Sequence, residues 1–308
     1  MGHYLLIGAG FSRNWGGPLS EEVTGSLLGE LHDDIGIANA LRRGPFEDAF
    51  GGFQPHAAAN PGAGQIRFQN AVAGLFSRLN KTFLTKDFEF SKDVKFSVRA
   101  FLARFDAIFS LNQDLLLEIH YIPTGPHGKW NGVALPGMTC SPPPGHTDPT
   151  GCTWKPTDNH THDRTFQPLY KLHGSSNWRN ETGEQLLIMG NEKTGAIQRF
   201  PVLRRYHDEF AARLSEGNAK LMIIGYSFQD EHINAVIERA SREHRLGTSL
   251  VNPSGRAVLR DPKLERASIY VPRGIEEIKL IGEMRRPLSV VFGGGDSFAH
   301  GEMMRFFS

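Results

Sequence analysis

The stretch Tyr4-Leu5-Leu6-Ile7-Gly8-Ala9-Gly10 begins almost at the first residue and indicates the fold class. Its four apolar residues, bounded by glycine, predict a short buried strand of a parallel sheet. Gly8 and Gly10 then permit a tight turn that lets the backbone approach a ligand closely. Ser20, followed by two glutamates, predicts the start of a helix. Strand, glycine turn and helix form a common cradle for a nucleotide phosphate, in which backbone N–H groups face the anion.

The glycine turn differs from the dinucleotide fingerprint of hydride-transferring enzymes. That fingerprint has a third glycine three residues after the second. Arg13 occupies this position here. The turn therefore predicts a nucleotide-type α/β opening without pointing to a dehydrogenase. Gly-x-Gly alone is also compatible with a purely structural turn.

The composition is that of an ordinary globular protein, with 39% hydrophobic and 22% charged residues among 308. Because 34 Lys and Arg nearly balance 33 Asp and Glu, no net charge favours nucleic acid or an anionic membrane. No apolar run approaches the ~20 residues of a membrane span, and no secretory signal precedes the first strand. Cys140 and Cys152 are too few for a secreted disulfide framework. We therefore expect a cytoplasmic protein that binds neither membranes nor nucleic acid directly.

The order of predicted elements gives an α/β core with two insertions. Apolar residues spaced by three and four predict helices over 66–83 and 94–105, so 45–104 is expected to form an inserted helical lobe. Residues 121–164 are rich in proline and glycine and predict a long irregular loop. The core is then expected to be a Rossmann-like parallel sheet with helices on both faces, formed by residues 1–44, 105–120 and 165–308.

Polar residues and glycine turns follow the other predicted strands at their carboxyl ends, where open α/β sheets bind ligands. The strands are predicted at 105–111, 166–172, 221–224 and 250–251, and the residues after them are Asn112, Asp114, His173, Gly225, Ser227 and Asn252. Simpler roles stay open for several of them. Either Asn112 or Asp114 could cap the helix that begins near residue 115, and Ser227 could cap the helix after it. A lone histidine is usually structural, so only the company of Asn112 and the glycine turn makes His173 a candidate.

Four of these motifs, in this order, resemble the sirtuin-like family of NAD-consuming enzymes. They are Gly8-Ala-Gly10-x-Ser12 with Gly17-Pro18, Ser110-x-Asn112-x-Asp114, Lys171-Leu-His173-Gly174 and Gly225-Tyr-Ser227-Phe228. Leu-His-Gly-Ser and Gly-Tyr-Ser-Phe-x-Asp-x-His-Ile look particularly like the bacterial sirtuin-like NADases of antiphage defence. Each motif is weak alone, but four in order at successive strand ends are fairly specific.

The departures from the family concern protein deacylation. Deacylase sirtuins follow the Gly-Pro turn with Asp-Phe-Arg, whereas Leu19-Ser20-Glu21 follows here. They also hold a four-cysteine zinc module, which two cysteines cannot build. The other potential ligands in 121–168 lack the Cys-x₂-Cys and His-x₃₋₅-His spacings of structural zinc sites. They are His127, Cys140, His146, Cys152, His160 and His162. No metal is therefore expected, and NAD hydrolysis is favoured over deacylation.

The resemblance also implies roles for individual residues. Asn112 would orient the nicotinamide ribose or a water molecule, and His173 would accept a proton near neutral pH. Asp114 would orient either group. No general acid is needed, because nicotinamide leaves as a neutral molecule. The turn formed by Gly8, Ala9, Gly10, Ser12 and Arg13 would hold the diphosphate, and Gly225, Ser227 and Asn252 would line the adenosine side. Arg13 could instead pair with a surface acid.

The resemblance implies an NAD glycohydrolase that releases nicotinamide and ADP-ribose, acting as a gated effector of antiphage defence by NAD depletion. Two other functions stay open: a protein deacylase or ADP-ribosyltransferase, and a noncatalytic module that binds NAD or ADP-ribose. Many relatives carry a C-terminal sensing domain, whereas this chain ends soon after the core. We therefore expect a homo-oligomer, gated by assembly or by a separately encoded partner such as an ATPase, an Argonaute-like protein or a nucleotide-processing enzyme.

Overall fold

The computed structural model describes most of the chain, namely residues 1–44, 46, 49, 62–123, 128–141, 151–158, 163–190, 193–260 and 273–308. Four histidines of the predicted loop lie outside the described residues, which are His127, His146, His160 and His162. Within the described ranges, no helix is both long and apolar enough to cross a membrane.

A parallel sheet of seven strands forms the centre of the molecule, in the order β11-β10-β9-β1-β2-β6-β3. The predicted α/β Rossmann-like fold is therefore confirmed. The strands are β1 (His3–Ile7), β2 (Ala107–Ser110), β3 (Gly132–Ala134), β6 (Phe166–Lys171), β9 (Lys220–Ile224), β10 (Gly247–Val251) and β11 (Leu280–Met284). The apolar runs predict five of them, whereas the strands at the two ends of the order, β3 and β11, are not predicted.

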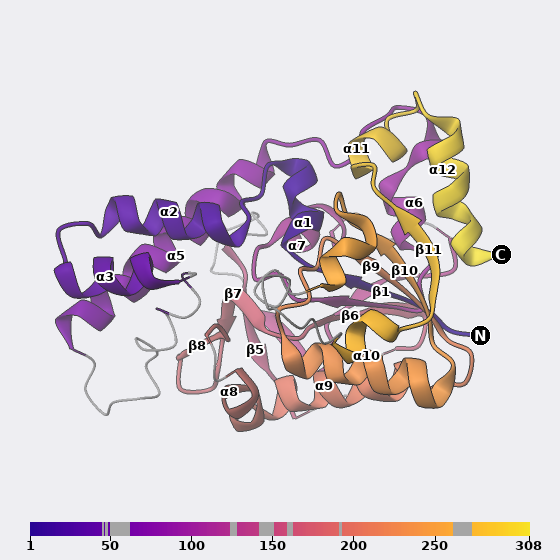
Figure 1. Cartoon of the computed structure of the whole chain (residues 1–308). Coiled ribbons are helices and arrows are strands. Elements are labelled where there is room, and N and C mark those ends of the chain that lie inside the picture. Colours follow the sequence, from indigo (N-terminus) through magenta and orange to yellow (C-terminus); the bar gives the residue numbers. More distant parts are fainter. Residues whose placement is uncertain are drawn as a thin grey trace, which may run out of the picture.

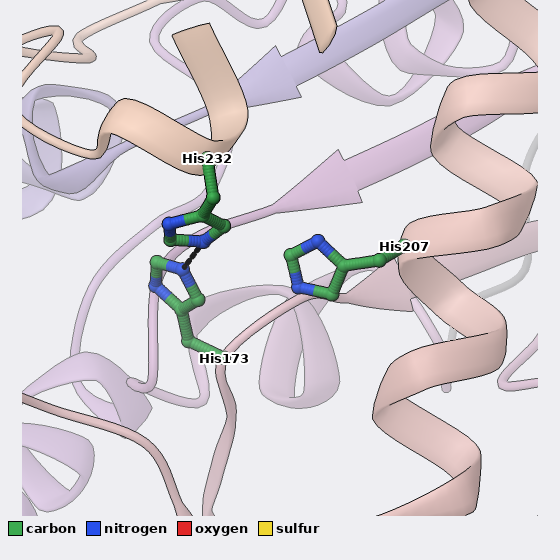
Figure 2. A group of neighbouring side chains, drawn as sticks. All are labelled: His173, His207 and His232. Atoms are coloured by element: carbon green, nitrogen blue, oxygen red, sulfur yellow. Dashed lines mark hydrogen bonds between the residues drawn. The ribbon is translucent and has the colours of Figure 1, made fainter. Parts of the chain in front are cut away.

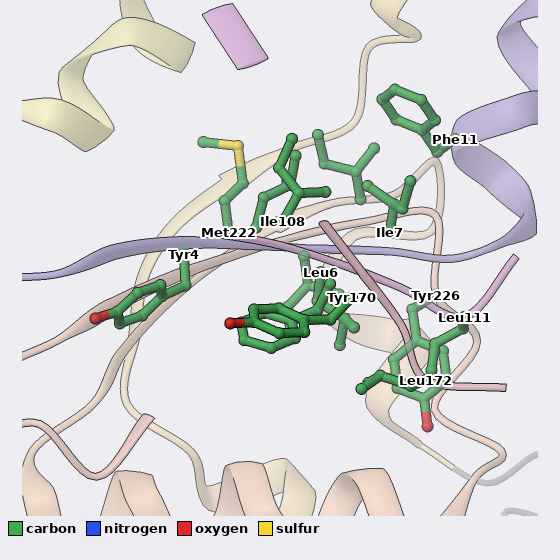
Figure 3. Close-up of a cluster of buried hydrophobic side chains, with 14 of the residues drawn as sticks. Tyr4, Leu6, Ile7, Phe11, Ile108, Leu111, Tyr170, Leu172, Met222 and Tyr226 are labelled. Carbon is green, nitrogen blue, oxygen red and sulfur yellow. The ribbon is translucent and has the colours of Figure 1, made fainter. Parts of the chain in front are cut away.

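Strand β1 lies in the middle of the strand order, and it is covered on both faces of the sheet, as its run of apolar side chains requires. Successive side chains of a strand point to opposite faces. Tyr4 and Leu6 therefore lie on one side of β1 and Ile7 on the other (Figure 3), and all three are buried. Helices α9 (Pro201–Leu214) and α10 (Glu231–His244) cover one face, and α6 (Val98–Leu102) and α12 (Ser297–Met304) cover the other (Figure 1).

A second hydrophobic cluster lies beside the sheet, in a helical lobe formed by α2 (Ser20–Glu30), α3 (Ile35–Arg43) and α5 (Ala63–Leu84) (Figure 1). The helix predicted at 66–83 is thus confirmed. Helices α2 and α3 pack in this second cluster, whereas the sequence prediction placed residues 1–44 in the core. Segment η3 (Val94–Phe96) and helix α6, predicted in the lobe, flank the main core, where Phe101 contacts Phe105 and Phe292. The division into domains itself stays a prediction.

Residues 121–164 contain more regular structure than the predicted loop. Besides β3, they include β4 (Met138–Ser141) and β5 (Thr153–Pro156). These two join β7 (Gly174–Arg179) and β8 (Gln185–Leu187) in a four-stranded sheet of order β4-β5-β7-β8. The loop prediction was wrong for these strands, because runs of three or four residues are too short to show periodicity.

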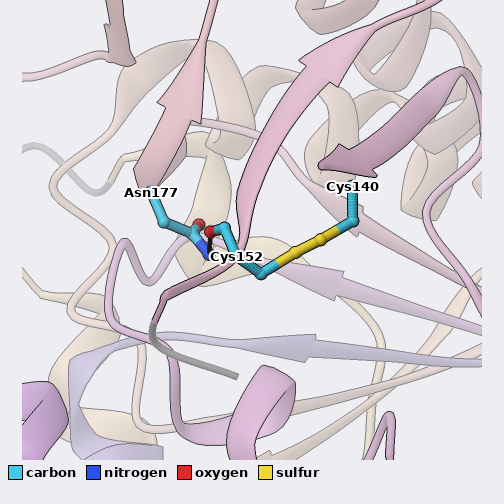
Figure 4. Close-up of a disulfide and its surroundings, with 3 residues drawn as sticks. All are labelled: Cys140, Cys152 and Asn177. Atoms are coloured by element: carbon cyan, nitrogen blue, oxygen red, sulfur yellow. Dashed lines mark hydrogen bonds between the residues drawn. A yellow bond between two sulfur atoms is a disulfide. The ribbon is translucent and has the colours of Figure 1, made fainter. Parts of the chain in front are cut away.

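The two cysteines form a disulfide within this segment. Cys140 lies in β4 and Cys152 immediately precedes β5, with Cα atoms 6.0 Å apart (Figure 4). The carbonyl oxygen of Cys152 accepts a hydrogen bond from Asn177 Nδ2 in β7 at 3.0 Å. The bridge therefore joins the first two strands of the small sheet, and neither sulfur is a free thiolate for a metal.

The other described helical segments are short and mostly connect strands or close the end of the chain. They are α1 (Ala9–Ser12), η1 (Arg13–Trp15), α7 (Leu116–His120), α8 (Lys193–Arg199), η5 (Gly255–Leu259), η6 (Gly274–Glu277), α11 (Leu288–Val291) and η7 (Arg305–Phe307).

Candidate active site

The two glycine turns at the carboxyl ends of β1 and β9 contact each other. Gly8 N donates to Ile224 O at 3.0 Å, and Gly10 N donates to Gly225 O at 2.9 Å. A Cβ added to Gly225 would lie 2.3 Å from Gly10 C, and Gly225 has a φ of +66°. The amides of Gly8 and Gly10 are therefore used within the protein and do not face an anion as predicted. Glycine is required here because two backbones meet.

The substitution Gly225→Ala tests this contact. The added methyl group meets backbone atoms that cannot rotate away, and the backbone is left-handed, where an L side chain costs roughly 1–2 kcal/mol. With overpacking added, we expect a loss of about 2–4 kcal/mol in the free energy of unfolding, measured by urea titration. Gly217→Ala is the control, because its Cβ would meet no atom within 4 Å. Equal stability of the two variants would contradict a close contact between the turns.

Asn112 and Ser12 form a buried pair between the ends of β2 and β1. Asn112 Nδ2 donates to Ser12 Oγ at 3.0 Å, and the two residues are 8% and 2% exposed. Asn112 N also donates to Ser110 Oγ at 3.1 Å, which fixes the backbone at the end of β2. In the structure, the Ser12 hydroxyl therefore holds the Asn112 amide. The roles of Asn112 at the ribose and of Ser12 at the diphosphate, which the family resemblance implies, stay predictions.

Asp114 lies one residue before the N-cap of the helix that follows, which is Leu115. Asp114 Oδ1 accepts a hydrogen bond from Leu116 N at 3.0 Å, at the start of α7. Asp114 therefore binds the first amide of α7, while neither Asn112 nor Asp114 occupies the N-cap position that the sequence left open for them. A role for Asp114 in orienting the substrate stays a prediction.

A buried ion pair joins the end of β6 to helix α7. Lys171 Nζ lies 2.5 Å from Glu118 Oε1 of α7, and their side chains are 2% and 4% exposed. The same Nζ donates to Asp114 O at 2.6 Å and to Ser175 Oγ at 2.7 Å. Burial raises the pKa of Glu118, and the charge of Lys171 opposes that rise. The pair therefore links the turn that carries Asn112 to the turn that carries His173.

His173 follows β6 and is 2% exposed. Its Nε2 lies 3.2 Å from His232 Nε2 at the start of α10, and His207 of α9 lies beside both rings (Figure 2). Burial holds the pKa of His173 well below its usual value of 6.5, although the charge of Asp230 opposes this shift. His173 is therefore neutral near pH 7 and able to accept a proton.

Asp230 provides the negative charge near these rings. Burial alone would raise its pKa, but the positive charge of Lys193, in an ion pair at 2.5 Å, lowers it, and the net shift of the pKa is downward. Tyr226 Oη donates to Asp230 O at 3.1 Å and also bonds Asn234 Oδ1 at 3.1 Å. These bonds hold the segment between β9 and α10 and thereby position His232.

One cavity of about 750 Å³ lies between the carboxyl edge of the sheet and the helical lobe. It brings together most of the predicted site residues, from five different strand ends. These are Gly8, Ala9, Gly10, Arg13, Asn112, Asp114, His173, Gly225, Ser227 and Asn252. Leu75, Phe76 and Leu79 of α5 line the lobe side. The predicted residue that does not line this cavity is Ser12, which lies behind Asn112.

Of the residues predicted to hold the diphosphate and the adenosine, some bond to other groups of the protein and one is exposed. Arg13 Nη1 pairs with Glu22 Oε2 at 2.6 Å, in agreement with the alternative interpretation of this arginine. Asn252 Oδ1 accepts from Ser254 N at 2.9 Å, which closes a local turn. Ser227 is exposed at the cavity and does not cap α10, which has Asp230 at its N-cap. Roles of these residues toward NAD stay predictions.

Two further residues of the site were not predicted. His232 lies inside the quoted motif Gly-Tyr-Ser-Phe-x-Asp-x-His-Ile, shortly after a strand end, so the motif could have identified it as a site residue. His207 lies within α9, in a stretch with no motif. Nothing local distinguishes it from a structural histidine.

Comparison with known proteins agrees with the geometry. A family model described as SIR2-like domain matches residues 106–278, more than half of the chain. The match includes Asn112, His173 and the Gly225 turn, whereas the Gly8 turn precedes it. No curated protein matches the chain. SIR2-like domains are typically NAD-dependent enzymes, and the seven-stranded parallel sheet fits that fold. The predicted sirtuin-like resemblance is thus confirmed, and the chain belongs to the family of SIR2-like domains.

Proposed function

We propose that this protein hydrolyses the nicotinamide–ribose bond of NAD and releases nicotinamide and ADP-ribose. One observation carries the proposal: Asn112 and a buried, neutral His173 line the same cavity at neighbouring strand ends. The cavity volume of about 750 Å³ also lies within the roughly 300–1,000 Å³ of ligand pockets.

The chemistry asks little of the protein. Nicotinamide carries a positive charge in NAD and leaves neutral, so no acid has to protonate it. Asn112, held by Ser12, orients the ribose hydroxyls or the attacking water. His173 accepts the proton that the water releases as its oxygen bonds to the ribose carbon. Ala9 and Arg13 line the cavity at the first turn, and we propose their backbone amide and guanidinium as donors to the diphosphate.

Product analysis tests the proposal directly. Purified protein is incubated with NAD and an acyl-lysine peptide, and the products are separated by chromatography and mass spectrometry. We expect free ADP-ribose and nicotinamide, with an unchanged peptide. Acyl-ADP-ribose would indicate a deacylase, a modified peptide an ADP-ribosyltransferase, and intact NAD a binding module. His173→Ala protein, purified in the same way, controls for contaminating NADases.

We further propose that cleavage is gated and serves antiphage defence by depleting NAD. The lobe has its own hydrophobic cluster and lines the cavity, and Asn80 of α5 bonds it to the segment after Asn112, because Asn80 Oδ1 accepts from Leu115 N at 2.9 Å. Assembly into a homo-oligomer, or binding of a separately encoded partner to the lobe, would close the cavity to bulk water. It would also hold the Asn112 and His173 side chains in the geometry needed for cleavage.

Gating predicts slow NAD turnover by the dilute monomer. Its mass is verified by light scattering, and the rate per chain is compared with that of concentrated protein. We expect the rate per chain to rise with assembly. Asn80→Ala should weaken this dependence, since it removes the hydrogen bond from α5 to Leu115 N, whereas Arg78→Ala on the exposed side of α5 is the control. Fast hydrolysis by the monomer, without toxicity on expression, would contradict gating.

A further inference from the structure

We propose that His173, His207 and His232 form a binding site for one divalent transition metal ion, and that the bound ion inhibits NAD cleavage by occupying the nitrogen that His173 uses as a base. The second part rests on the function proposed above. The site lies outside the segment 121–168, whose cysteines and histidines lack the spacing of zinc ligands.

The geometry fits an ion of the zinc type. His173 Nε2 and His232 Nε2 are 3.2 Å apart. Two nitrogens bound tetrahedrally to zinc at 2.0–2.1 Å are separated by about 3.3 Å, so this pair already has the required spacing. One nitrogen of each of the three rings lies within 4.8 Å of the others, and a rotation of the His207 ring would be needed to bring its nitrogen to the spacing of the other two (Figure 2).

The hydrogen bonds leave suitable lone pairs. His207 Nε2 lies 2.9 Å from Leu172 O, and because a carbonyl only accepts, this nitrogen carries the proton. The Nδ1 of His207 is then free to bind a metal, and a histidine ligand usually donates its other N–H to such an acceptor. Between His173 and His232, one Nε2 carries the shared proton. Metal binding moves that proton to the Nδ1 of the same ring, without net release.

The three ligands come from separate rigid elements. His173 lies in the turn after β6, His207 lies in α9 and His232 lies in α10, and the two helices pack against each other. Such a set resembles the three protein ligands of zinc sites that keep an open fourth position. Of the three histidines, His173 also lines the cavity. Imidazole ligands favour zinc, copper, nickel or cobalt over magnesium and calcium.

Charge at the site is balanced. Lys193 would repel a dication, but its ammonium is paired with Asp230 at 2.5 Å. The Asp230 carboxylate therefore offsets Lys193, and three uncharged rings remain as the ligands. The consequence for catalysis is direct, because a histidine nitrogen that binds a metal has no lone pair for a proton. NAD cleavage itself then requires no metal, and an added ion opposes it.

Cobalt(II) titration of untagged protein, first treated with a chelator, tests the binding site. We expect one ion per chain, with the visible absorption bands of tetrahedral cobalt, and displacement of the bands by zinc. His207→Gln and His232→Gln should each weaken binding by more than about 100-fold, because even outer-shell changes cost 10–100-fold. His120→Gln is the control, since His120 Nε2 also bonds a carbonyl, that of Phe83, at 2.8 Å. Melting curves show that each variant is folded.

A second measurement compares NAD cleavage with and without zinc. We expect zinc to lower the wild-type rate by at least about tenfold, a free-energy difference of 1.4 kcal/mol, and to lower that of His207→Gln much less. Wild-type cobalt affinity equal to that of His207→Gln would overturn the site. Cobalt binding without a fall in rate would overturn the inhibition. If the protein binds cobalt but the metal-free form cleaves no NAD, the proposed function is refuted and the metal site is still supported.

Discussion

His173→Ala and Asn112→Ala are each expected to lower NAD turnover by about 10²- to 10⁴-fold, the usual effect of losing a general base or an orienting group. Both side chains line the cavity at neighbouring strand ends. The measurement is the steady-state rate of nicotinamide release by metal-free protein, with the melting temperature recorded for each variant. Wild-type turnover in a folded variant would remove that residue from the mechanism.

Ser12→Ala distinguishes orientation from direct contact. Ser12 bonds Asn112 Nδ2 but does not line the large cavity, so its loss leaves Asn112 present and less well held. A net hydrogen bond contributes about 0.5–1.5 kcal/mol, and we therefore expect a fall of roughly tenfold or less. A fall as large as that of Asn112→Ala would mean that Ser12 itself contacts the substrate.

The pH dependence of cleavage follows from the burial of His173. A base acts in its neutral form, and burial lowers the pKa of His173 well below the usual 6.5. The rate should therefore stay high as the pH falls through 6.5 and decline only at lower pH. The acidic limb of the kcat/KM profile, which reports the free enzyme, measures this. A decline centred above pH 6.5 would contradict the buried, neutral histidine.

Lys171→Met is expected to destabilise the fold by about 3–5 kcal/mol, because it leaves Glu118 buried without its partner. Urea unfolding monitored by circular dichroism measures the loss. The double variant Lys171→Met with Glu118→Leu should recover most of it, since replacing both ions by apolar groups is often neutral. Arg78→Met is the control, because its pair with Glu30 is exposed. A double variant no more stable than Lys171→Met would contradict an unpaired charge as the cause.

The loss in Lys171→Met should also depend on pH. Burial raises the pKa of Glu118 above its usual 4.5, and removal of the opposing Lys171 raises it further. Above pH 4.5 the unfolded chain has released this proton while the folded variant still holds it, so stability falls as the pH rises. The difference from wild type should therefore be smallest in acid and grow toward neutral pH.

The central strands of the sheet were largely predictable from the sequence. Apolar runs such as Tyr4–Ile7 signal a buried strand by themselves, and a glycine or polar residue marks where each run ends. Because parallel strands end at one edge of a sheet, the positions of Asn112 and His173 after their strands were enough to predict that the two lie near each other. The edge strands β3 and β11 escaped prediction because neither shows a continuous apolar run: β3 has only three residues, and Gly282 and Glu283 interrupt β11.

Local patterns in the chain were therefore sufficient for the fold class, the glycine turns and the two residues most suited to catalysis. The packing of the whole chain was needed to show that Gly8 and Gly10 pack against Gly225, that Lys171 pairs with Glu118, and that Asn112 bonds Ser12. It also brings His207 and His232 to His173. Most of these contacts join residues tens to hundreds of positions apart, and side chains that meet only after the strands and helices pack leave no periodic or spaced pattern in the chain.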